Sequence, residues 1–526
     1  MAYYKDLREH VKALEAHGKL IRIKREINKD TELMPLVRCQ FRGLPAEDRK
    51  AFLFENVTDV KGRKYSVPVL VASHAASREV YAIGMNCQPD EIMEKWARAR
   101  RNPIEPRLVA SGPVHEEIHL GEKLLEHGGL EEFPVPISTP GFDNAPYYTA
   151  ANWISKDPEN GIRNVGNYRG MIKSSTRVGI MNPPSKGLRT HWEKCRHMGK
   201  PLQAAIAIGT VPAVGYCAAV RFPPDVDELA ISGGIANEAM ELLKCRTVDL
   251  EVPATAEVVI EGHLPTDFLE REGPFGEFTG YMAPEVVGPY FNVTCITHRK
   301  NPVFNVFLSQ FPPSESSTLR NIGEEANLYK FLRVDCGLPV VDVAVPEQTS
   351  AQPFCVISMK KTHPSQAWQV LNGAVTASTV RKIVIVVDDD IDPHNADSVN
   401  WALAWRVQPG RDVRIMNGIF AELDPSLAHP GESRDPYPNG TGGSAMLINA
   451  TTKWDYPPVS LPRKEFMERA IHIWEEEGLP KLSMVKPWYG YSLGFWTKEF
   501  EEEAELALKG EHYKTGEKLA KQRVKP

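Results

Sequence analysis

Apolar residues recur near the N-terminus at the spacings of helices and strands. Leu7, Val11 and Leu14 are separated by four and three residues. This spacing places them on one helix face and predicts an amphipathic helix within residues 4–19. Strands are predicted at the short apolar runs that follow, 20–23, 51–55 and 67–72. Together these elements predict an N-terminal α/β domain over residues 1–113.

The pattern changes after residue 113 to short apolar runs separated by Gly and Pro. Strands are predicted at the runs 204–208, 255–261, 291–297 and 303–308. Many short strands with turn residues between them are typical of a barrel or a sandwich. The sequence therefore predicts a central β domain over residues 114–321.

Strand and helix patterns alternate again from residue 322. The continuous apolar run 382–387 ends in Asp388–Asp390, as expected of a buried strand in an α/β layer. We expect a C-terminal α/β domain over residues 322–460. An extension over residues 461–526 then contains an amphipathic helix at 463–477 and an aromatic run at 488–496. The predicted fold class is multidomain α/β, of the α+β type.

Composition narrows the functional class. The chain has 526 residues and a formal net charge of -6, which argues against nucleic acid as a partner. Its eight Cys form no C-x-x-C pair and are expected to be reduced thiols.

Residues 201–220 carry no charge, but Gly and Pro interrupt them, so a buried strand is favoured over a membrane span. The N-terminus has no signal peptide pattern, and we expect a cytoplasmic protein.

Several short motifs suggest metal or phosphate chemistry, but each has a more ordinary interpretation. His115–His119 matches the zinc-protease pattern H-E-x-x-H, yet Pro113 and Gly121 bracket it and an edge strand fits equally well. Residues 191–197 contain two His and one Cys, but a solvated helix is favoured over a metal site. The acidic run 388–390 is expected to cap the following helix or to lie in solvent. The Gly-rich run 440–444 is expected to be a plain loop rather than a phosphate-binding loop.

The most informative segment is Glu272-Gly273-Pro274-Phe275-Gly276-Glu277. Two carboxylates flank a Gly-Pro-aromatic-Gly turn, so both can face one cavity. Close carboxylates favour a state in which one of them holds a proton near neutral pH. This arrangement suits general acid catalysis.

Four segments together resemble the UbiD family of decarboxylases: 164–169 (Asn-Val-Gly-Asn-Tyr-Arg), the segment of Glu228, 252–257 and 272–277. The resemblance runs in order from about residue 4 to residue 454. It implies an N-terminal α/β domain, a central split β-barrel and a C-terminal α/β domain that forms dimers or hexamers. It also implies prenylated FMN as cofactor, which a flavin prenyltransferase supplies, with a divalent metal, usually manganese (Mn2+), and often potassium (K+).

The resemblance assigns roles to individual residues. Arg169 would clamp the substrate carboxylate, Glu272 would orient Arg169, and Glu277 would return the proton after CO2 leaves. The implied metal ligands are Asn164, Glu228 and His191, and the implied cofactor-binding residues are Asn167, Tyr168, Arg169 and Lys186.

Two positions depart from the family pattern. The family's third metal ligand is a His, and the matching place, 185–187, has none; His191 is the nearest substitute. Many relatives also carry a phosphate-binding Lys where this chain has 443–446 (Gly-Ser-Ala-Met). Lys186 or Lys453 would compensate.

The predicted function is the reversible, non-oxidative decarboxylation of an aromatic, heteroaromatic or aroyl carboxylate. Phe304, Phe307 and Phe311 would form a pocket for a flat ring. The alternatives are a non-catalytic, UbiD-like subunit of a multi-subunit carboxylase, and a zinc hydrolase built on His115 and His119.

Overall fold

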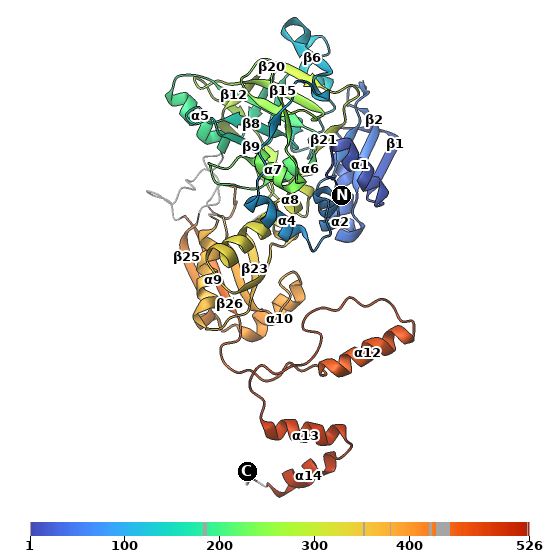
Figure 1. Ribbon diagram of the computed structural model, residues 1–526, viewed down its shortest axis with the longest axis vertical. Coiled ribbons are helices and arrows are strands. Elements are labelled where there is room, and N and C mark those ends of the chain that lie inside the picture. The colour runs from blue at the N-terminus through green and yellow to red at the C-terminus, as the bar shows by residue number, and fades with distance from the viewer. Residues whose placement is uncertain are drawn as a thin grey trace. The chain divides into compact units, whose positions relative to one another are not determined.

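A computed structural model describes residues 2–181, 187–350, 353–378, 380–419, 423–427, 442–522 and 524 (Figure 1). The chain folds as two units. The first comprises the described residues of 1–330, 345–354 and 420–443, and the second those of 331–344, 355–419 and 444–526.

The first sheet of the first unit has the strand order β1-β2-β4-β21, with β3 paired to β2. Its strands are β1 (Leu20–Asn28), β2 (Ala51–Thr58), β3 (Lys64–Tyr65), β4 (Val69–Val71) and β21 (Phe304–Val306). The helices of this region are α1 (Leu7–Ala16), α2 (Leu33–Gly43), α3 (Arg78–Met85) and α4 (Ile92–Arg101). The predicted N-terminal helix and strands are therefore confirmed.

One strand belongs to a different sheet from the one expected. The run 303–308 forms β21, but β21 pairs in parallel with β4, Phe304 opposite Val69. Phe304 is fully buried and its ring stacks on Phe133, with 5.7 Å between the centroids. Burial of this apolar strand against the N-terminal sheet accounts for the difference.

The second sheet of the first unit is antiparallel, nine-stranded and curled, in the order β7-β10-β11-β20-β15-β12-β8-β9, with β6 paired to β20. The strands are β6 (Glu117–Leu120), β7 (Tyr147–Tyr148), β8 (Asn152–Lys156), β9 (Arg163–Asn167), β10 (Gly170–Ser174), β11 (Arg177–Ile180), β12 (Leu202–Ile208), β15 (Val258–Leu264) and β20 (Tyr290–His298). This curled sheet confirms the expected split barrel.

Strand β12 explains why residues 201–220 carry almost only apolar side chains. Ala204, Ile206 and Ile208 lie in one core cluster, whereas Ala205 and Ala207 lie in another. Because successive side chains of a strand point to opposite faces, the sheet is buried on both sides. The apolar run 201–220 is thus β12 followed by a short helix, and no helix among the described residues is long and apolar enough to cross a membrane.

Four helices and several short strands complete the first unit. The helices are α5 (Gly187–His197), α6 (Pro212–Ala219), α7 (Glu228–Ala236) and α8 (Glu315–Tyr329). The strands are β5 (Arg107–Leu108), β13 (Glu241–Lys244), β14 (Glu251–Pro253), β16 (Glu270–Glu272), β17 (Phe275–Gly276), β18 (Met282–Ala283) and β19 (Val286–Gly288). Helix α5 packs against β8, β9 and β12.

The second unit contains a sheet of order β22-β23-β24-β26-β25. Its strands are β22 (Val340–Ala344), β23 (Phe354–Met359), β24 (Ile383–Asp388), β25 (Val413–Ile419) and β26 (Gly443–Ala450), and its helices are α9 (Ser365–Thr376), α10 (Ala396–Arg406) and α11 (Pro409–Asp412). Strand β24 is the predicted buried strand. The acidic run at its end does not cap α10, which Asn395 caps. Arg406 pairs with Asp388 at 3.2 Å and with Asp390 at 2.6 Å, whereas Asp389 is exposed to solvent as expected.

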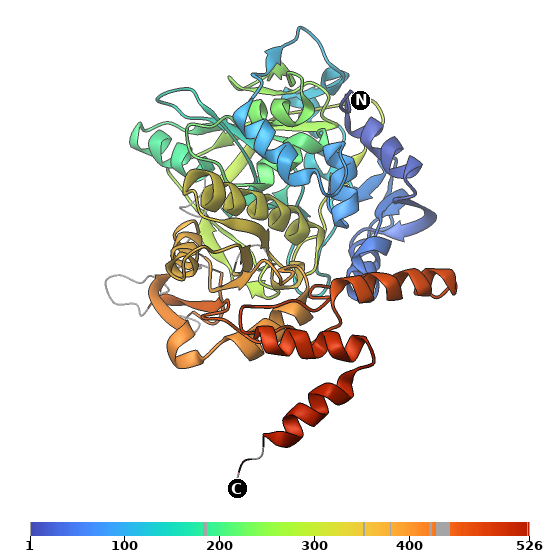
Figure 2. The same ribbon diagram turned by 60° about the horizontal axis from the view of Figure 1, so that its bottom comes forward.

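The C-terminal extension forms three helices, α12 (Lys464–Glu476), α13 (Lys498–Leu508) and α14 (His512–Lys521) (Figure 2). Helices α13 and α14 contact each other, and Lys518 pairs with Glu503 at 2.7 Å. Helix α12 confirms the predicted amphipathic helix. None of the three helices buries a residue. In the aromatic run, Tyr491 donates a hydrogen bond to Asp390, but Phe495 and Trp496 remain 55% and 46% exposed.

Candidate active site

Arg169 lies between β9 and β10 and joins the two glutamates of the 272–277 segment. Its Nε and Nη2 donate to the two oxygens of Glu272 at 2.9 Å and 2.6 Å, and its Nη1 donates to Glu277. The side chains of Arg169, Glu272 and Glu277 are only 8%, 0% and 13% exposed. Burial by itself lowers the pKa of Arg169, but the charges of Glu277 and Glu272 outweigh it and the net shift is upward. The structure thus brings the three predicted residues into one buried ion-pair network.

Aromatic side chains form one wall of this network. The guanidinium of Arg169 lies over the ring of Phe275, 5.3 Å from its centroid. Tyr147 packs on the same ring, with 4.1 Å between the centroids, and burial raises the pKa of Tyr147 far above its ordinary value. Sequence reasoning missed Tyr147, because its position depends on how β7 approaches the 272–277 segment.

Two polar residues before β7 hold the 272–277 segment in place. Asp143 accepts hydrogen bonds from the backbone N–H of Gly276 at 3.1 Å and of Thr139 at 2.6 Å. Asn144 Nδ2 donates to the carbonyl of Gly273 at 2.6 Å. These contacts fix the turn that sets Glu272 and Glu277 on either side of Arg169. The adjacent Asp-Asn pair before an apolar strand is a turn signal that could have suggested an anchoring role.

A second arginine affects Glu277 and was not predicted from the sequence. Arg320 of α8 lies with its guanidinium over the ring of Phe278, 5.2 Å from the centroid. Burial lowers the pKa of Arg320, and the negative charges of Glu277 and Glu324 oppose that shift. Glu277 therefore contacts one guanidinium and lies in the field of another.

The three predicted metal ligands lie on or beside the paired strands β8 and β9. Asn164 is on β9, and Glu228 accepts a hydrogen bond from the N–H of Val165 at 2.8 Å. The Nδ1 of His191 is 2.9 Å from the hydroxyl of Ser155, which is the cross-strand neighbour of Asn164. Helix α5 also approaches β9 closely, since a Cβ at Gly187 would lie 1.9 Å from Asn164 Oδ1.

The charges and protonation states of these residues are compatible with a bound cation. Burial raises the pKa of Glu228 to about 8, and no Lys or Arg among the described residues forms an ion pair with it. Burial lowers the pKa of His191 to about 4, so its ring is neutral at neutral pH, the form that ligates metals. His191 is 5% exposed and is not the solvated helix residue expected as the default.

The N-x-G-x-Y-R segment has a local structural reason for its glycine. A Cβ at Gly166 would lie 2.3 Å from the hydroxyl of Tyr168, so only glycine lets this ring fold back over β9. The Tyr168 ring lies in the core and its hydroxyl is 3.4 Å from Asn164 Nδ2. Burial raises the pKa of Tyr168 to about 12. Asn167 Oδ1 is buried and has no hydrogen-bond partner among the described residues.

The structure describes only one of the two lysines proposed to bind a phosphate. Lys186 lies outside the described residues, as do residues 440 and 441 of the Gly-rich run. Lys453 donates its Nζ protons to the backbone carbonyls of Arg406, Asn449 and Thr451 at 2.6–2.9 Å. The compensating role suggested for Lys453 is therefore wrong, because its donors are already used.

The H-E-x-x-H match does not form a zinc-protease helix. His115 ends a 3-10 turn, Pro113–His115, and His119 lies in strand β6. A helix would be needed to place both rings on one face. The edge-strand interpretation is confirmed, and the zinc hydrolase reading of this pair is wrong.

Sequence comparison matches three consecutive parts of the chain to one family. The models carry the description 3-octaprenyl-4-hydroxybenzoate carboxy-lyase: the N-terminal domain matches residues 11–100, the Rift-related domain 107–310 and the C-terminal domain 317–450. The chain belongs to the UbiD family.

Relatives and solved structures agree with this assignment. A phenolic acid decarboxylase of Sedimentibacter hydroxybenzoicus is 32% identical over 88% of this chain and 94% of its own. An evolved dimeric form of the UbiD-class enzyme HmfF from Pelotomaculum thermopropionicum, solved in complex with prFMN, has a TM-score of 0.75 at 33% identity and covers 87% of this chain and 97% of its own. The closed form of the S. hydroxybenzoicus vanillic acid decarboxylase has a TM-score of 0.77 at 28% identity, covering 90% of this chain and 100% of its own.

Two of the three phenylalanines expected to line a substrate pocket of this UbiD-family chain do not do so. Phe304 is buried in β21, and Phe307 is 2% exposed and packs against His74, with 5.0 Å between the ring centroids. Both are core residues. Phe311 is 49% exposed, and a Cβ at Gly280 would lie 3.1 Å from its ring. Only Phe311 thus lies beside the loop that carries Glu277.

Proposed function

We propose that this chain is a prenylated-FMN-dependent carboxy-lyase that reversibly decarboxylates an aromatic or heteroaromatic carboxylate. The observation that carries the proposal is the buried network in which Arg169 is held by Glu272 and contacts Glu277. Arginine binds carboxylates through two parallel hydrogen bonds, and a glutamate beside it is placed to move a proton. The relatives whose names specify aromatic acids support this substrate class.

The cofactor would be held near Asn167, Tyr168, Arg169 and Lys186. Two buried polar atoms support this placement: Asn167 Oδ1 and Gln310 Nε2 have no hydrogen-bond partner among the described residues. Gln310 adjoins the catalytic turn, since a Cβ at Gly276 would lie 2.6 Å from its Cγ. Buried polar groups need partners, and a polar cofactor would supply them. When bound, prenylated FMN supplies the electron sink that protein side chains lack.

We further propose that Asn164, Glu228 and His191 hold a divalent metal, manganese, with K+ nearby. An amide oxygen, a carboxylate and a neutral imidazole suit Mn2+. The buried Glu228 without a cationic partner supports the assignment, because a divalent ion would stabilise its charged form.

The steps carried out by this chain follow from the ion pairs. The substrate carboxylate would bind Arg169 Nη1 in place of Glu277, while Glu272 keeps the guanidinium oriented through two hydrogen bonds. A third carboxylate beside one guanidinium is unfavourable unless one acid takes up a proton. Glu277 is the acid that is released, so it would take up that proton and deliver it to the ring carbon after CO2 leaves.

The substrate would be an acid without a second carboxylate near residues 310–313, because this stretch carries no charged side chain and the neighbouring Arg38 already donates to backbone carbonyls within residues 309–313. Phenolic acids, heteroaromatic acids and aroyl thioesters fit this description. The test is a panel of such acids with CO2 release as the readout, using protein produced with a flavin prenyltransferase. No turnover with any acid would favour the alternative, a non-catalytic UbiD-like subunit.

We also propose the domain division 1–113, 114–321, 322–460 and 461–526. The family matches break between 100 and 107 and between 310 and 317, close to the first two boundaries, which supports it. The last segment lies beyond the third match, which ends at residue 450.

Glu228→Ala is expected to lose the metal and, with it, the cofactor on gel filtration. The substitution removes the only carboxylate of the proposed ligand set, and with it the charge that offsets the cation. Flavin absorbance and manganese content per chain are measured on the eluted protein. His191→Ala tests the third ligand in the same way.

Glu238→Ala is the matched control, since Glu238 is exposed just beyond the C-terminal end of the same helix, α7. It should keep both manganese and flavin. Stoichiometric flavin and manganese in Glu228→Ala would refute the metal assignment, and normal metal content in His191→Ala would move the third ligand elsewhere.

We propose that the aromatic run 488–496 of the extension packs against a neighbouring subunit of a homo-oligomer, a dimer or a hexamer; the alternatives are that it covers the cofactor domain or packs within its own chain. The helices of the extension bury no residue, and large side chains such as Phe495, Trp496 and Phe500 are 43–55% exposed. Contiguous exposed apolar surface is typical of an interface.

Truncation after Pro487 should therefore lower the molar mass measured by light scattering, because it removes these aromatic residues. Truncation after Gly510 removes α14 alone and should leave the mass per assembly nearly unchanged. An unaltered number of subunits after truncation at Pro487 would contradict the interface.

A further inference from the structure

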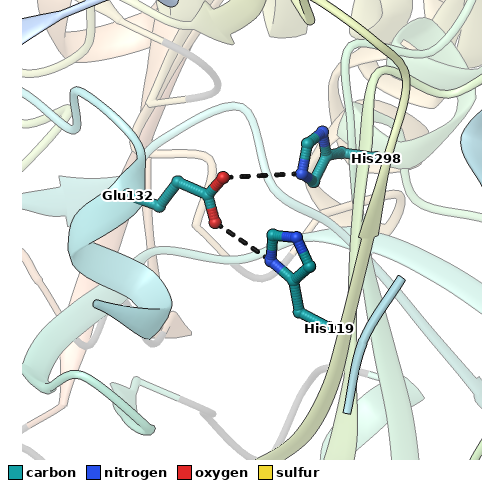
Figure 3. A group of neighbouring side chains, drawn as sticks. All are labelled: His119, Glu132 and His298. Carbon is teal, nitrogen blue, oxygen red and sulfur yellow. Dashed lines mark ion pairs between the residues drawn. The ribbon is translucent and has the colours of Figure 1, made fainter. Parts of the chain in front are cut away.

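His119, Glu132 and His298 converge on one point of the first unit (Figure 3). They come from three separate segments: strand β6, the 3-10 turn Gly129–Glu132, and the end of strand β20. One ligand atom from each can be chosen so that all three lie within 4.8 Å of one another. No residue of this cluster belongs to the network of Arg169 or to the proposed manganese ligands.

Glu132 forms close ion-pair contacts with both histidines of the cluster. His119 Nδ1 lies 3.1 Å from Glu132 Oε2, and His298 Nε2 lies 3.5 Å from Glu132 Oε1. Glu132 Oε2 and His298 Nε2 are nevertheless buried without a hydrogen-bond partner among the described residues. His298 is 7% exposed, so its unpartnered nitrogen is shielded from solvent and points into the cluster. Buried atoms of this kind need a partner, which a bound cation between the three side chains would supply.

The ring of His298 is oriented as metal-binding histidines are. Its Nδ1 lies 2.8 Å from the backbone carbonyl of Arg299, which can only accept, so Nδ1 carries a proton and Nε2 is the ring nitrogen that faces Glu132. Metal-ligating histidines usually donate their second ring N–H in this way, which fixes tautomer and orientation. Phe133 packs against the same ring, with 5.7 Å between the centroids, and holds it in place.

The spacing of the three side chains is close to that of the ligands around a zinc-class ion. Zinc bound by His nitrogen and carboxylate oxygen at about 2.0–2.1 Å keeps its ligand atoms about 3.3 Å apart in a tetrahedron. His119 Nδ1 lies 3.1 Å from one oxygen of Glu132 and His298 Nε2 lies 3.5 Å from the other, and one ligand atom from each residue can be chosen within 4.8 Å of the other two. Two neutral imidazoles and one carboxylate also leave one positive charge on a divalent ion, so a water molecule can occupy the fourth position.

We propose that His119, Glu132 and His298 form a second metal site, specific for a divalent transition metal of the zinc class. The ion fastens the segment between β6 and the turn at Gly129–Glu132 onto the edge of the curled sheet. Its role is structural, because its three ligands come from three separate segments and the ion would hold those segments together. Among the described residues, no other cluster of potential metal ligands joins them. The site is independent of the proposed function, since it shares no ligand with the cofactor or the manganese site.

The test uses the full-length holoenzyme in excess Mn2+, so that the manganese site is filled, with one equivalent of Zn2+ added. Metal analysis after gel filtration should find one zinc per chain. Zinc-edge X-ray absorption should find two imidazole nitrogens and oxygen ligands at about 2.0–2.2 Å. Zinc should slow tryptic cleavage after the exposed Lys123, which lies within the fastened segment, by at least about tenfold if it suppresses local opening.

Substitutions then assign the ligands. Glu132→Gln and His119→Gln should each bind less than about one tenth as much zinc and lose the protection of Lys123. His17→Gln is the control, because His17 is an exposed histidine at the end of α1, and it should bind zinc like the parent. Glu228→Ala should also keep its zinc even where it loses manganese.

The proposal is overturned by three results. Wild-type protein that binds no zinc would show that a proton rather than a metal fills the cluster. Zinc binding unchanged in both Gln variants, or an absorption spectrum without imidazole ligands, would place the ion elsewhere. The spectrum of the wild-type protein decides even if the variants fail to fold.

Discussion

Glu277→Gln should retain cofactor and substrate binding while its decarboxylation rate falls by about 10²–10⁴-fold, the contribution of general acid catalysis. Glutamine keeps the shape of the side chain and its hydrogen bond with Arg169 but has no acidic proton to deliver. Because Glu277 is 13% exposed, bulk water cannot readily replace it as donor. Flavin absorbance, the substrate KM and kcat separate binding from chemistry.

Glu285→Gln is the matched control for this variant. Glu285 pairs with Arg271 at the surface, where their side chains are 43% and 76% exposed, and it plays no part in the network. It should turn over like the parent protein. If Glu277→Gln retained the kcat of the parent, the proton would have to come from Glu272 or from a bound water.

Arg169→Lys should lose at least about 10²-fold in kcat/KM, because misplacement of a substrate by about 1 Å costs that much. Lysine keeps the positive charge that Glu272 requires in the interior, but it cannot form two parallel hydrogen bonds to Glu272 and donate to the substrate carboxylate in the same geometry. Arg169→Ala would instead leave Glu272, which is 0% exposed, without a counter-charge and would lower stability by about 3–5 kcal/mol. The lysine variant therefore separates the loss of positioning from the loss of folding.

Steady-state kinetics and thermal unfolding of both arginine variants make this comparison. Arg177→Lys is the control, since the side chain of Arg177 is 44% exposed on β11. A lysine variant with the kcat/KM of the parent would mean that another group, such as Arg320, binds the carboxylate.

Much of the catalytic site could be predicted because its residues lie in two short, distinctive segments. Neither segment by itself indicates that Arg169 meets Glu272. That contact arises because the β9–β10 turn and the β16–β17 turn meet in the folded first unit. The resemblance to the UbiD family supplied this tertiary information, and the structure agrees with it.

The residues that the sequence did not reveal depend on contacts between distant segments. Tyr147 and Arg320 reach the site from β7 and α8, and no local spacing indicates this. Phe304 and Phe307 were misplaced for the same reason: their run reads as an aromatic strand, but pairing of β21 with β4 buries it. His119 was visible in the sequence only as part of a false helix pattern, because its partners Glu132 and His298 lie elsewhere in the chain.

Hydrogen–deuterium exchange at the ring carbon of the decarboxylated product tests the central claim most directly. Exchange requires proton transfer to and from that carbon but no CO2, so it isolates the role of Glu277 from the binding of the carboxylate. The holoenzyme should exchange this hydrogen, Arg169→Lys should still exchange it within a few-fold, and Glu277→Gln should be slower by at least about 10²-fold. Exchange in Glu277→Gln at the rate of the parent protein would contradict the assignment of Glu277 as the proton donor.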